Sequence, residues 1–287
     1  MNQAKIFINL IRLKKPIGFM LLFWPCAWGL TLAYDFSENL YDYFFYLTLF
    51  FFGSVLMRSA GCIVNDILDK EFDKKVFRTK DRPIASNKVS IKLGIFYTII
   101  LCFLALLVLL NFNTYTIYLA LGSMPLAFTY PLMKRFTYWP QLFLGITFNY
   151  GLILGWTAIK GQIDIVPIIL YLGAIFWTLG YDTIYGYQDI KDDEIIGLKS
   201  TSIKFKNNPH KFLIICYSVF LLNLLITGLF MELNNLYYFV FVVIFIQMIY
   251  FQLIKLDVKS NKNCLTTFKS NNLLGLLVLF SLIIGKF

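Results

Sequence analysis

Long apolar segments alternate with short polar breaks along the whole chain of 287 residues. Each apolar segment is long enough to form a helix that crosses a lipid bilayer, and the strict alternation typical of a membrane β-barrel is absent. The pattern predicts an all-α, polytopic membrane protein in which residues 1–287 form a single domain. Nine transmembrane helices are expected, at residues 16–34, 41–64, 93–111, 114–132, 138–158, 165–187, 211–231, 235–254 and 270–286.

Basic residues are concentrated in alternate polar breaks. The N-terminal segment and the second, fourth, sixth and eighth breaks carry 23 of the 26 lysines and arginines. The positive-inside rule therefore predicts a cytoplasmic N-terminus and an external C-terminus. The net charge of +10 is explained by this topology and by contact with anionic lipid headgroups, so no nucleic-acid partner is expected.

Cysteine, histidine and targeting patterns narrow the class of protein further. The five cysteines are scattered singly and His210 is the only histidine, so a thiolate or imidazole metal site is not expected. The first apolar run continues to about Tyr34 without a cleavage site, and the N-terminus lacks the composition of an organelle transit peptide. We expect a multi-pass protein of a bacterial inner membrane.

A first acidic cluster follows the second apolar segment. If residues 65–73 are helical, Asn65, Asp69 and Asp73 stack on one face because they are spaced by four. Asp66 and Glu71 then point elsewhere and are expected to be solvated. Oxygen ligands at this density suit Mg²⁺, which binds through a few carboxylates together with substrate phosphates.

A second acidic cluster follows the sixth apolar segment, on the same side of the membrane. Asp189 and Asp193 are again spaced by four, and Asp182 and Tyr185 belong to the same helical stripe. We expect the two clusters to face each other at the cytoplasmic mouth of the bundle. The competing interpretation is that both are solvated helix caps.

Basic side chains follow each cluster. Arg78, Lys80 and Arg82 come after the first cluster, and Lys199 comes after the second. Carboxylates with nearby arginine and lysine are typical of phosphoryl sites, where metal ions and cations share a diphosphate.

These motifs resemble those of the UbiA-type membrane prenyltransferases. The NDxxDxxxD motif of that family is matched by Asn65, Asp66, Asp69 and Asp73, and its DxxxD motif by Asp189 and Asp193. The sequences "MRSAGCIVNDILDKEFDKKVFRTKDRPIAS" and "YDTIYGYQDIKDDEIIGLKSTSI" look like the branch that serves ubiquinone biosynthesis. The resemblance covers nearly the whole chain. It implies a nine-helix bundle around a central cavity, open to the cytoplasmic side, and prenyl transfer from a polyprenyl diphosphate to 4-hydroxybenzoate.

The resemblance also implies roles for individual residues. Arg82 and Lys134 would contact the diphosphate, and Tyr130 with Lys134 matches the family's YxxxK pattern. Arg58 would bind the carboxylate of 4-hydroxybenzoate; the alternative is a structural ion pair. The Mg²⁺ ligands would be Asn65, Asp69, Asp73, Asp189 and Asp193.

The reaction expected from these residues is electrophilic aromatic prenylation. Tyr130 and Tyr185 would stabilise an allylic carbocation, and Asp182 is the candidate base for the ring proton. Transfer to another acceptor (a naphthoate, haem or a chlorophyll precursor) stays open, and a cation transporter is a further alternative. One departure from the family pattern is Asn87 where glycine is usual; asparagine tolerates a left-handed backbone, so the turn is expected to survive.

Overall fold

Helices form all the regular secondary structure in residues 3–287, the part of the chain that this computed structural model describes. Each of the nine predicted ranges overlaps a long helix. These are α2 (Ile17–Ala33), α3 (Leu40–Leu68), α5 (Ile91–Leu109), α6 (Thr114–Thr129), α8 (Pro140–Lys160), α9 (Ile165–Gly186), α12 (Pro209–Phe230), α13 (Asn235–Gln247), which continues into the π-helix η2 (Met248–Ile254), and α14 (Asn261–Ile284).

Within the described residues, seven helices are long and apolar enough to cross a membrane. The segments outside this group are α2, with 17 residues, and α6, with 16. Helix α5 buries only Gly94, Leu101 and Ala105, so most of its apolar surface faces outward, as it would toward lipid. The structure therefore supports a multi-pass membrane fold.

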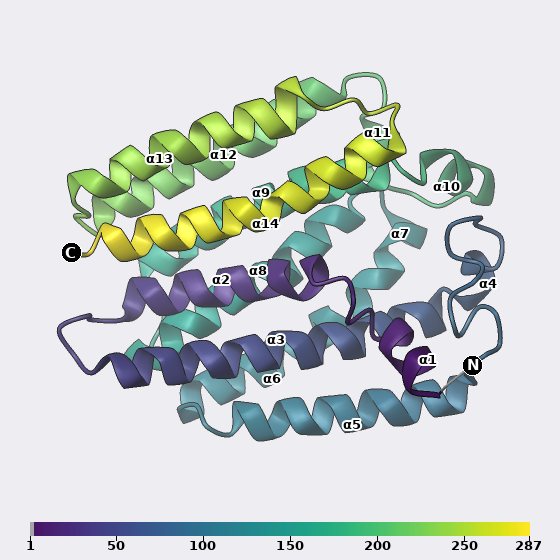
Figure 1. The fold of residues 1–287 in the computed structure, drawn as a ribbon, viewed down its shortest axis with the longest axis horizontal. Helices are drawn as coiled ribbons and strands as arrows, with labels where there is room; N and C mark the ends of the chain where they lie inside the picture. Colours follow the sequence, from purple (N-terminus) through teal and green to yellow (C-terminus); the bar gives the residue numbers. More distant parts are fainter. Residues whose placement is uncertain (1–2) are drawn as a thin grey trace.

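Short helices gather at one end of the bundle, where the long helices α3 and α9 end (Figure 1). They are α1 (Gln3–Leu10), α4 (Lys70–Asp73), α7 (Met133–Phe136), which follows the 3₁₀ turn η1 (Tyr130–Leu132), α10 (Ile190–Ile196) and α11 (Thr201–Lys204). Both acidic clusters lie in this end of the molecule. The C-terminus lies at the opposite end (Figure 1).

Polar residues in the breaks define where the long helices begin. Side chains of asparagine, serine and aspartate accept hydrogen bonds from the first backbone N–H groups, which have no partner inside the helix. At the end of α8, Gly161 takes a left-handed conformation with φ of 66°. The capping residues are Asn39, Ser90, Asn113, Asp164, Asn234 and Ser260.

Helices α2 and α8 approach each other through glycines. A Cβ atom on Gly29 would lie 1.9 Å from the Leu152 carbonyl oxygen, and one on Gly155 would lie 2.3 Å from that of Cys26. Glycine is therefore required at both positions, as is common where helices pack inside a membrane. The contact brings the backbones of α2 and α8 close together.

Buried hydrogen bonds connect α9, α12, α14 and η2. The Trp177 indole donates to Asn271 Oδ1 at 2.8 Å, and Asn271 Nδ2 donates to Gln252 Oε1 at 3.3 Å. Gln252 also accepts from the Tyr217 hydroxyl at 3.2 Å. In an apolar interior, these polar groups satisfy one another's hydrogen-bonding requirements.

The last predicted span begins too late. Helix α14 starts at Asn261, nine residues before the predicted start at residue 270. Its polar first half is helical because Cys264, Thr267 and Asn271 face the protein interior, where they are buried. Hydropathy alone could not identify a helix that buries polar side chains against other helices.

Replacing Asn271 with leucine should destabilise the fold. The substitution leaves the buried Trp177 N–H without an acceptor, which costs about 1–3 kcal/mol. Thermal unfolding of the purified protein in detergent should show a lower Tm for Asn271→Leu, whereas Asn207→Leu, at an exposed loop position, should leave Tm unchanged. Equal Tm values for the two variants would contradict this role of the buried hydrogen bonds.

Candidate functional site

The first acidic cluster lies where α3 ends and α4 begins. The α-helix ends at Leu68, and Asp69 has φ of −97° and ψ of 6°. The four-residue step nevertheless continues, since Asp69 N donates to Asn65 O at 2.9 Å and Asp73 N donates to Asp69 O at 2.8 Å. Asp69 and Asp73 are buried, with 1% and 6% exposure, whereas Asn65 is half-buried.

The expectation that Asp66 is solvated was wrong. Asp66 is 1% exposed, and its Oδ1 atom forms ion pairs with Arg12 and with Arg82, the latter at 3.2 Å. Its side of the helix faces the N-terminal segment and the 77–87 loop. The spacing of residues within the helix cannot predict where these two segments lie. Glu71 is exposed, as predicted, and pairs with Lys74 at 2.7 Å.

Arg82 connects two carboxylates of this cluster. Its Nη1 atom donates to Asp73 Oδ2 at 2.8 Å as well as to Asp66. Arg12 pairs with the same Asp66 oxygen as Arg82 and has a left-handed backbone with φ of 56°. A non-glycine residue in this region costs about 1–2 kcal/mol. The two guanidinium groups thus lie side by side on one carboxylate.

Arg78 joins the two acidic clusters. It comes from the loop after the first cluster, and its Nε donates to Asp189 Oδ1 at 2.7 Å while Nη2 pairs with Asp189 Oδ2. Its Nη1 donates to the Tyr185 hydroxyl at 2.6 Å, and its guanidinium lies 5.1 Å from the centre of that ring. The pair brings the loop that follows the first cluster against Asp189 of the second, and the prediction that the two clusters face each other stays a prediction.

Two cations of α7 also contact the first acidic cluster. Lys134 forms an ion pair with Asp69 Oδ2, and Arg135 Nη2 lies 3.7 Å from Asp69 Oδ1 and donates to Leu68 O at 2.6 Å. The YxxxK pattern is divided between two elements, since Tyr130 begins η1 and Lys134 lies in α7.

Lys199 lies beside α7. Its backbone N–H donates to Lys134 O at 2.9 Å, and its Nζ donates to Phe136 O at 3.2 Å. These bonds attach the segment after the second cluster to α7. Contact of Lys199 with a diphosphate stays a prediction.

Arg58 lies deeper in the bundle, on α3. Its Nε atom is buried without a hydrogen-bond partner, and its guanidinium carbon lies 5.4 Å from the centre of the Phe148 ring. Gly18 of α2 leaves room for it, because a Cβ atom there would lie 2.9 Å from Arg58 Nε. Arg58 is close enough to interact electrostatically with Asp182 and Tyr130. These side chains, each predicted to contact substrate, therefore share one region.

The described residues contain no group of three or more histidine, cysteine, aspartate or glutamate side chains placed to hold a metal ion. The carboxylates are instead paired with cations. Asp69 Oδ1 is buried without a hydrogen bond, and its nearest cation is Arg135 Nη2 at 3.7 Å. Burial raises the pKa of the Asp193 carboxyl to about 6, and the negative charge of Asp189 acts in the same direction. The donor chemistry fits a hard divalent cation, and the predicted ligand set stays a prediction.

Two cations of this cluster, Arg12 and Arg135, were not predicted to belong to it. In the sequence they appear only among the basic residues of the polar breaks. Their partners are distant in the chain, 54 residues away for Arg12 and Asp66. The spacing of residues along one helix cannot predict an ion pair between segments that are so far apart in the chain.

Comparison with known proteins agrees with this arrangement. The model of the UbiA prenyltransferase family matches residues 22–278. The mitochondrial 4-hydroxybenzoate polyprenyltransferase of Bos taurus is 44% identical over 282 residues, which cover 98% of this chain and 75% of the relative. The 4-hydroxybenzoate geranyltransferase 1 of Lithospermum erythrorhizon is 40% identical over 288 residues, which cover 99% and 92%.

Two solved structures share the fold. The apo structure of a UbiA homolog from Aeropyrum pernix K1 gives a TM-score of 0.77 at 22% identity, over 92% of this chain and 97% of that one. A UbiA homolog from Archaeoglobus fulgidus, bound to DMAPP and Mg²⁺, gives 0.71 at 17% identity, over 96% and 98%. The family model matches most of this chain, and the two relatives named above are 44% and 40% identical to it over nearly its whole length. The chain therefore belongs to the UbiA prenyltransferase family.

Proposed function

We propose that this protein transfers a polyprenyl group from a polyprenyl diphosphate to 4-hydroxybenzoate, at the ring carbon ortho to the hydroxyl, as a step of ubiquinone biosynthesis. The observation that carries the proposal is the Arg78–Asp189 pair, which brings two acidic clusters and their cations together at one end of a membrane-type bundle. The acceptor follows from the names of the relatives, which state 4-hydroxybenzoate.

Magnesium is the metal that suits this site. When bound, Mg²⁺ would neutralise charge on the leaving diphosphate. The carboxylates that would hold it are now paired with arginine and lysine, so binding requires an exchange of partners. The cations would turn to the diphosphate and the carboxylates to the metal, which keeps every buried charge paired. The proposed ligands are Asn65, Asp69, Asp73, Asp189 and Asp193.

The diphosphate would be bound by Arg78, Arg82 and Lys134, with Lys199 at the edge of the site. Each of the first three already contacts a carboxylate that is also a proposed metal ligand. Guanidinium groups suit this role because they can donate two parallel hydrogen bonds to phosphate oxygens.

The acceptor would bind deeper, at Arg58. A buried guanidinium N–H without a partner is costly, and the carboxylate of 4-hydroxybenzoate would satisfy it. Phe148, which contacts Arg58, offers an apolar surface for the ring. The acceptor would then lie between this arginine and the diphosphate.

The chain's own residues would direct the rest of the reaction. As the allylic C–O bond breaks, the rings of Tyr130 and Tyr185 would stabilise the carbocation, and the bilayer-embedded site would exclude water. The ring carbon forms the new C–C bond, and Asp182 would accept the proton that this carbon loses. Asp182 suits this role because it lies one turn before Tyr185 on α9, close to Arg58.

We also propose the finer membrane arrangement. The nine long helices would all cross the bilayer around a central cavity open to the cytoplasm, with the N-terminus on that side and the C-terminus outside. The charge distribution of the polar breaks supports this orientation. We propose a bacterial inner membrane; the relatives from Bos taurus and Arabidopsis thaliana are named as mitochondrial.

Other functions receive less support. A naphthoate also carries a carboxylate that Arg58 could bind, so the preference for 4-hydroxybenzoate over a naphthoate, haem or a chlorophyll precursor rests on the relatives reported above, which name 4-hydroxybenzoate. A cation transporter would need charged residues along a path through the bilayer, whereas the acids gather at one end.

Replacing Asp69 or Asp189 with asparagine should lower kcat/KM for prenyl transfer by about 100-fold or more, because charge on the leaving group is no longer neutralised. The measurement is Mg²⁺-dependent transfer from a polyprenyl diphosphate to labelled 4-hydroxybenzoate in nanodiscs. Glu71→Gln, an exposed acid of the same segment, is the matched control and should retain activity. Near-normal turnover in either aspartate variant, at unchanged Tm, would refute the proposed site.

Replacing Arg58 with methionine should raise KM for 4-hydroxybenzoate by about 10- to 100-fold, because a charge-assisted hydrogen bond is lost. It should change KM for the neutral analogue 4-hydroxybenzamide far less. Arg78→Met is the comparison, since it should raise KM for the polyprenyl diphosphate instead. If Arg58→Met altered both substrates equally, its role as the acceptor's partner would be wrong.

The proposed orientation can be tested with single cysteines at exposed loop positions. A membrane-impermeant maleimide added to bacterial spheroplasts that express the protein should label Ser37→Cys and not Asn207→Cys. Four native cysteines are buried and Cys102 is half-buried, so the unmodified protein gives the background. Labelling of Asn207→Cys alone would reverse the orientation.

A further inference from the structure

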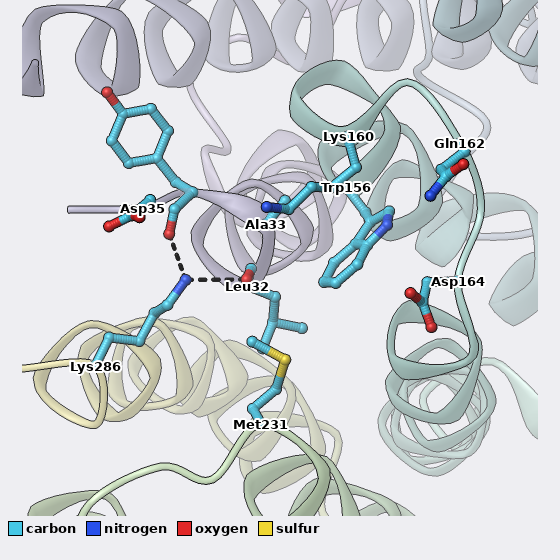
Figure 2. A pocket seen from close by; sticks show the side chains of 10 residues that line it. Leu32, Ala33, Asp35, Trp156, Lys160, Gln162, Asp164, Met231 and Lys286 are labelled. Atoms are coloured by element: carbon cyan, nitrogen blue, oxygen red, sulfur yellow. Dashed lines mark hydrogen bonds between the residues drawn. The ribbon is translucent and has the colours of Figure 1, made fainter. Parts of the chain in front are cut away.

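A pocket lies at the end of the bundle opposite the acidic clusters. It has a volume of about 490 Å³ and is formed by the end of α2, the end of α8, the turn at 161–164, Met231 and Lys286 (Figure 2). None of the residues discussed above for prenyl transfer lines it. The mechanism therefore leaves this pocket unexplained.

Two hydrogen-bond donors of the pocket have no partner in the described residues. The Trp156 side chain is 5% exposed, and its indole nitrogen is buried without an acceptor. Figure 2 shows that nitrogen on the side of the pocket that faces Gln162. Lys160 is exposed and forms no hydrogen bond or ion pair within residues 3–287. The two side chains are four residues apart on α8, so they share one face of that helix.

A second cation lies on the other side of the pocket. Lys286 Nζ donates to the carbonyls of Thr31 and Leu32 at 3.1 and 3.0 Å, and also to that of Tyr34. Burial and the positive charge of Lys160 lower the pKa of Lys286 to about 8. The two amines are thus close enough to repel each other, and an anionic group between them would relieve this repulsion.

Two carboxylates balance these cations. Asp35 is exposed and accepts hydrogen bonds from Ser37, and Asp164 caps the start of α9. Both line the pocket with Lys160 and Lys286, so its formal charges sum to zero. A simple anion would be repelled by the acids, and a simple cation by the lysines. A ligand that carries both charges fits all four groups.

The position of the pocket identifies the source of such a ligand. It lies at the ends of the helices α2 and α8, where tryptophan and tyrosine side chains meet lipid headgroups in membrane proteins. Leu32 and Met231 give it apolar walls as well. We propose that this pocket binds the headgroup of a phospholipid with a primary ammonium, its phosphate accepting hydrogen bonds from Lys160 and Trp156 and its ammonium facing Asp164 on the same side of the pocket.

The test is lipid retention by purified protein in native mass spectrometry, with phosphatidylethanolamine or phosphatidylglycerol added. We expect retention of phosphatidylethanolamine to be about 5-fold lower in Lys160→Met and Trp156→Phe than in the unmodified protein. Lys259→Met, an exposed lysine of the opposite end, is the matched control and should retain the lipid. Prenyl transfer should be unchanged in all three variants, so failure of this proposal is distinct from failure of the proposed function. Equal retention by all variants would overturn it.

A charge test separates the zwitterion from other phosphate sources. Asp164→Asn keeps the helix cap but removes one acid, so it should shift retention from phosphatidylethanolamine toward phosphatidylglycerol. In the unmodified protein, O-phosphoethanolamine should displace the lipid and raise Tm, whereas inorganic phosphate should do neither. Equal effects of inorganic phosphate, or equal retention of both lipids before and after the substitution, would overturn the proposed headgroup.

Discussion

Ion pairs between distant parts of the chain determine the architecture of one end of this bundle. Asp66, Asp69, Asp73 and Asp189 each meet arginine or lysine from another segment. Carboxylates in an apolar bundle are stable only when they are paired, because the unpaired charge would cost several kcal/mol. The loops around the site therefore fold onto the acids.

This constraint explains which parts of the molecule could be predicted from the sequence. The long helices follow from apolar length alone, and backbone hydrogen bonds over four residues join Asp69 to Asn65, Asp73 to Asp69 and Asp193 to Asp189. The backbone conformation of one loop residue could also be predicted from the sequence. Asn87 takes the left-handed conformation expected where the family has glycine, with φ of 55°.

Contacts between residues far apart in the chain could not be predicted from the sequence. Asp66 was expected to be solvated because its helix face was known but the neighbours of that face were not. The early start of α14 was missed for a similar reason, since its polar residues are buried by partners on η2 and α9. The identity of the acceptor comes from the relatives' names, since Arg58 indicates only that an acid would fit.

The pairing of Arg12 with Asp66 gives the N-terminal segment more than a topological role. The next methionine after Met1 is Met20, inside α2. Translation from that codon would still supply most of the hydrophobic helices, and hydropathy would judge the shortened product nearly intact. It would nevertheless leave Asp66 with a single basic partner and remove the helix α1 that packs against α3. Removal of residues 1–19 would therefore disturb the acidic cluster, although it would spare nearly all of the apolar sequence.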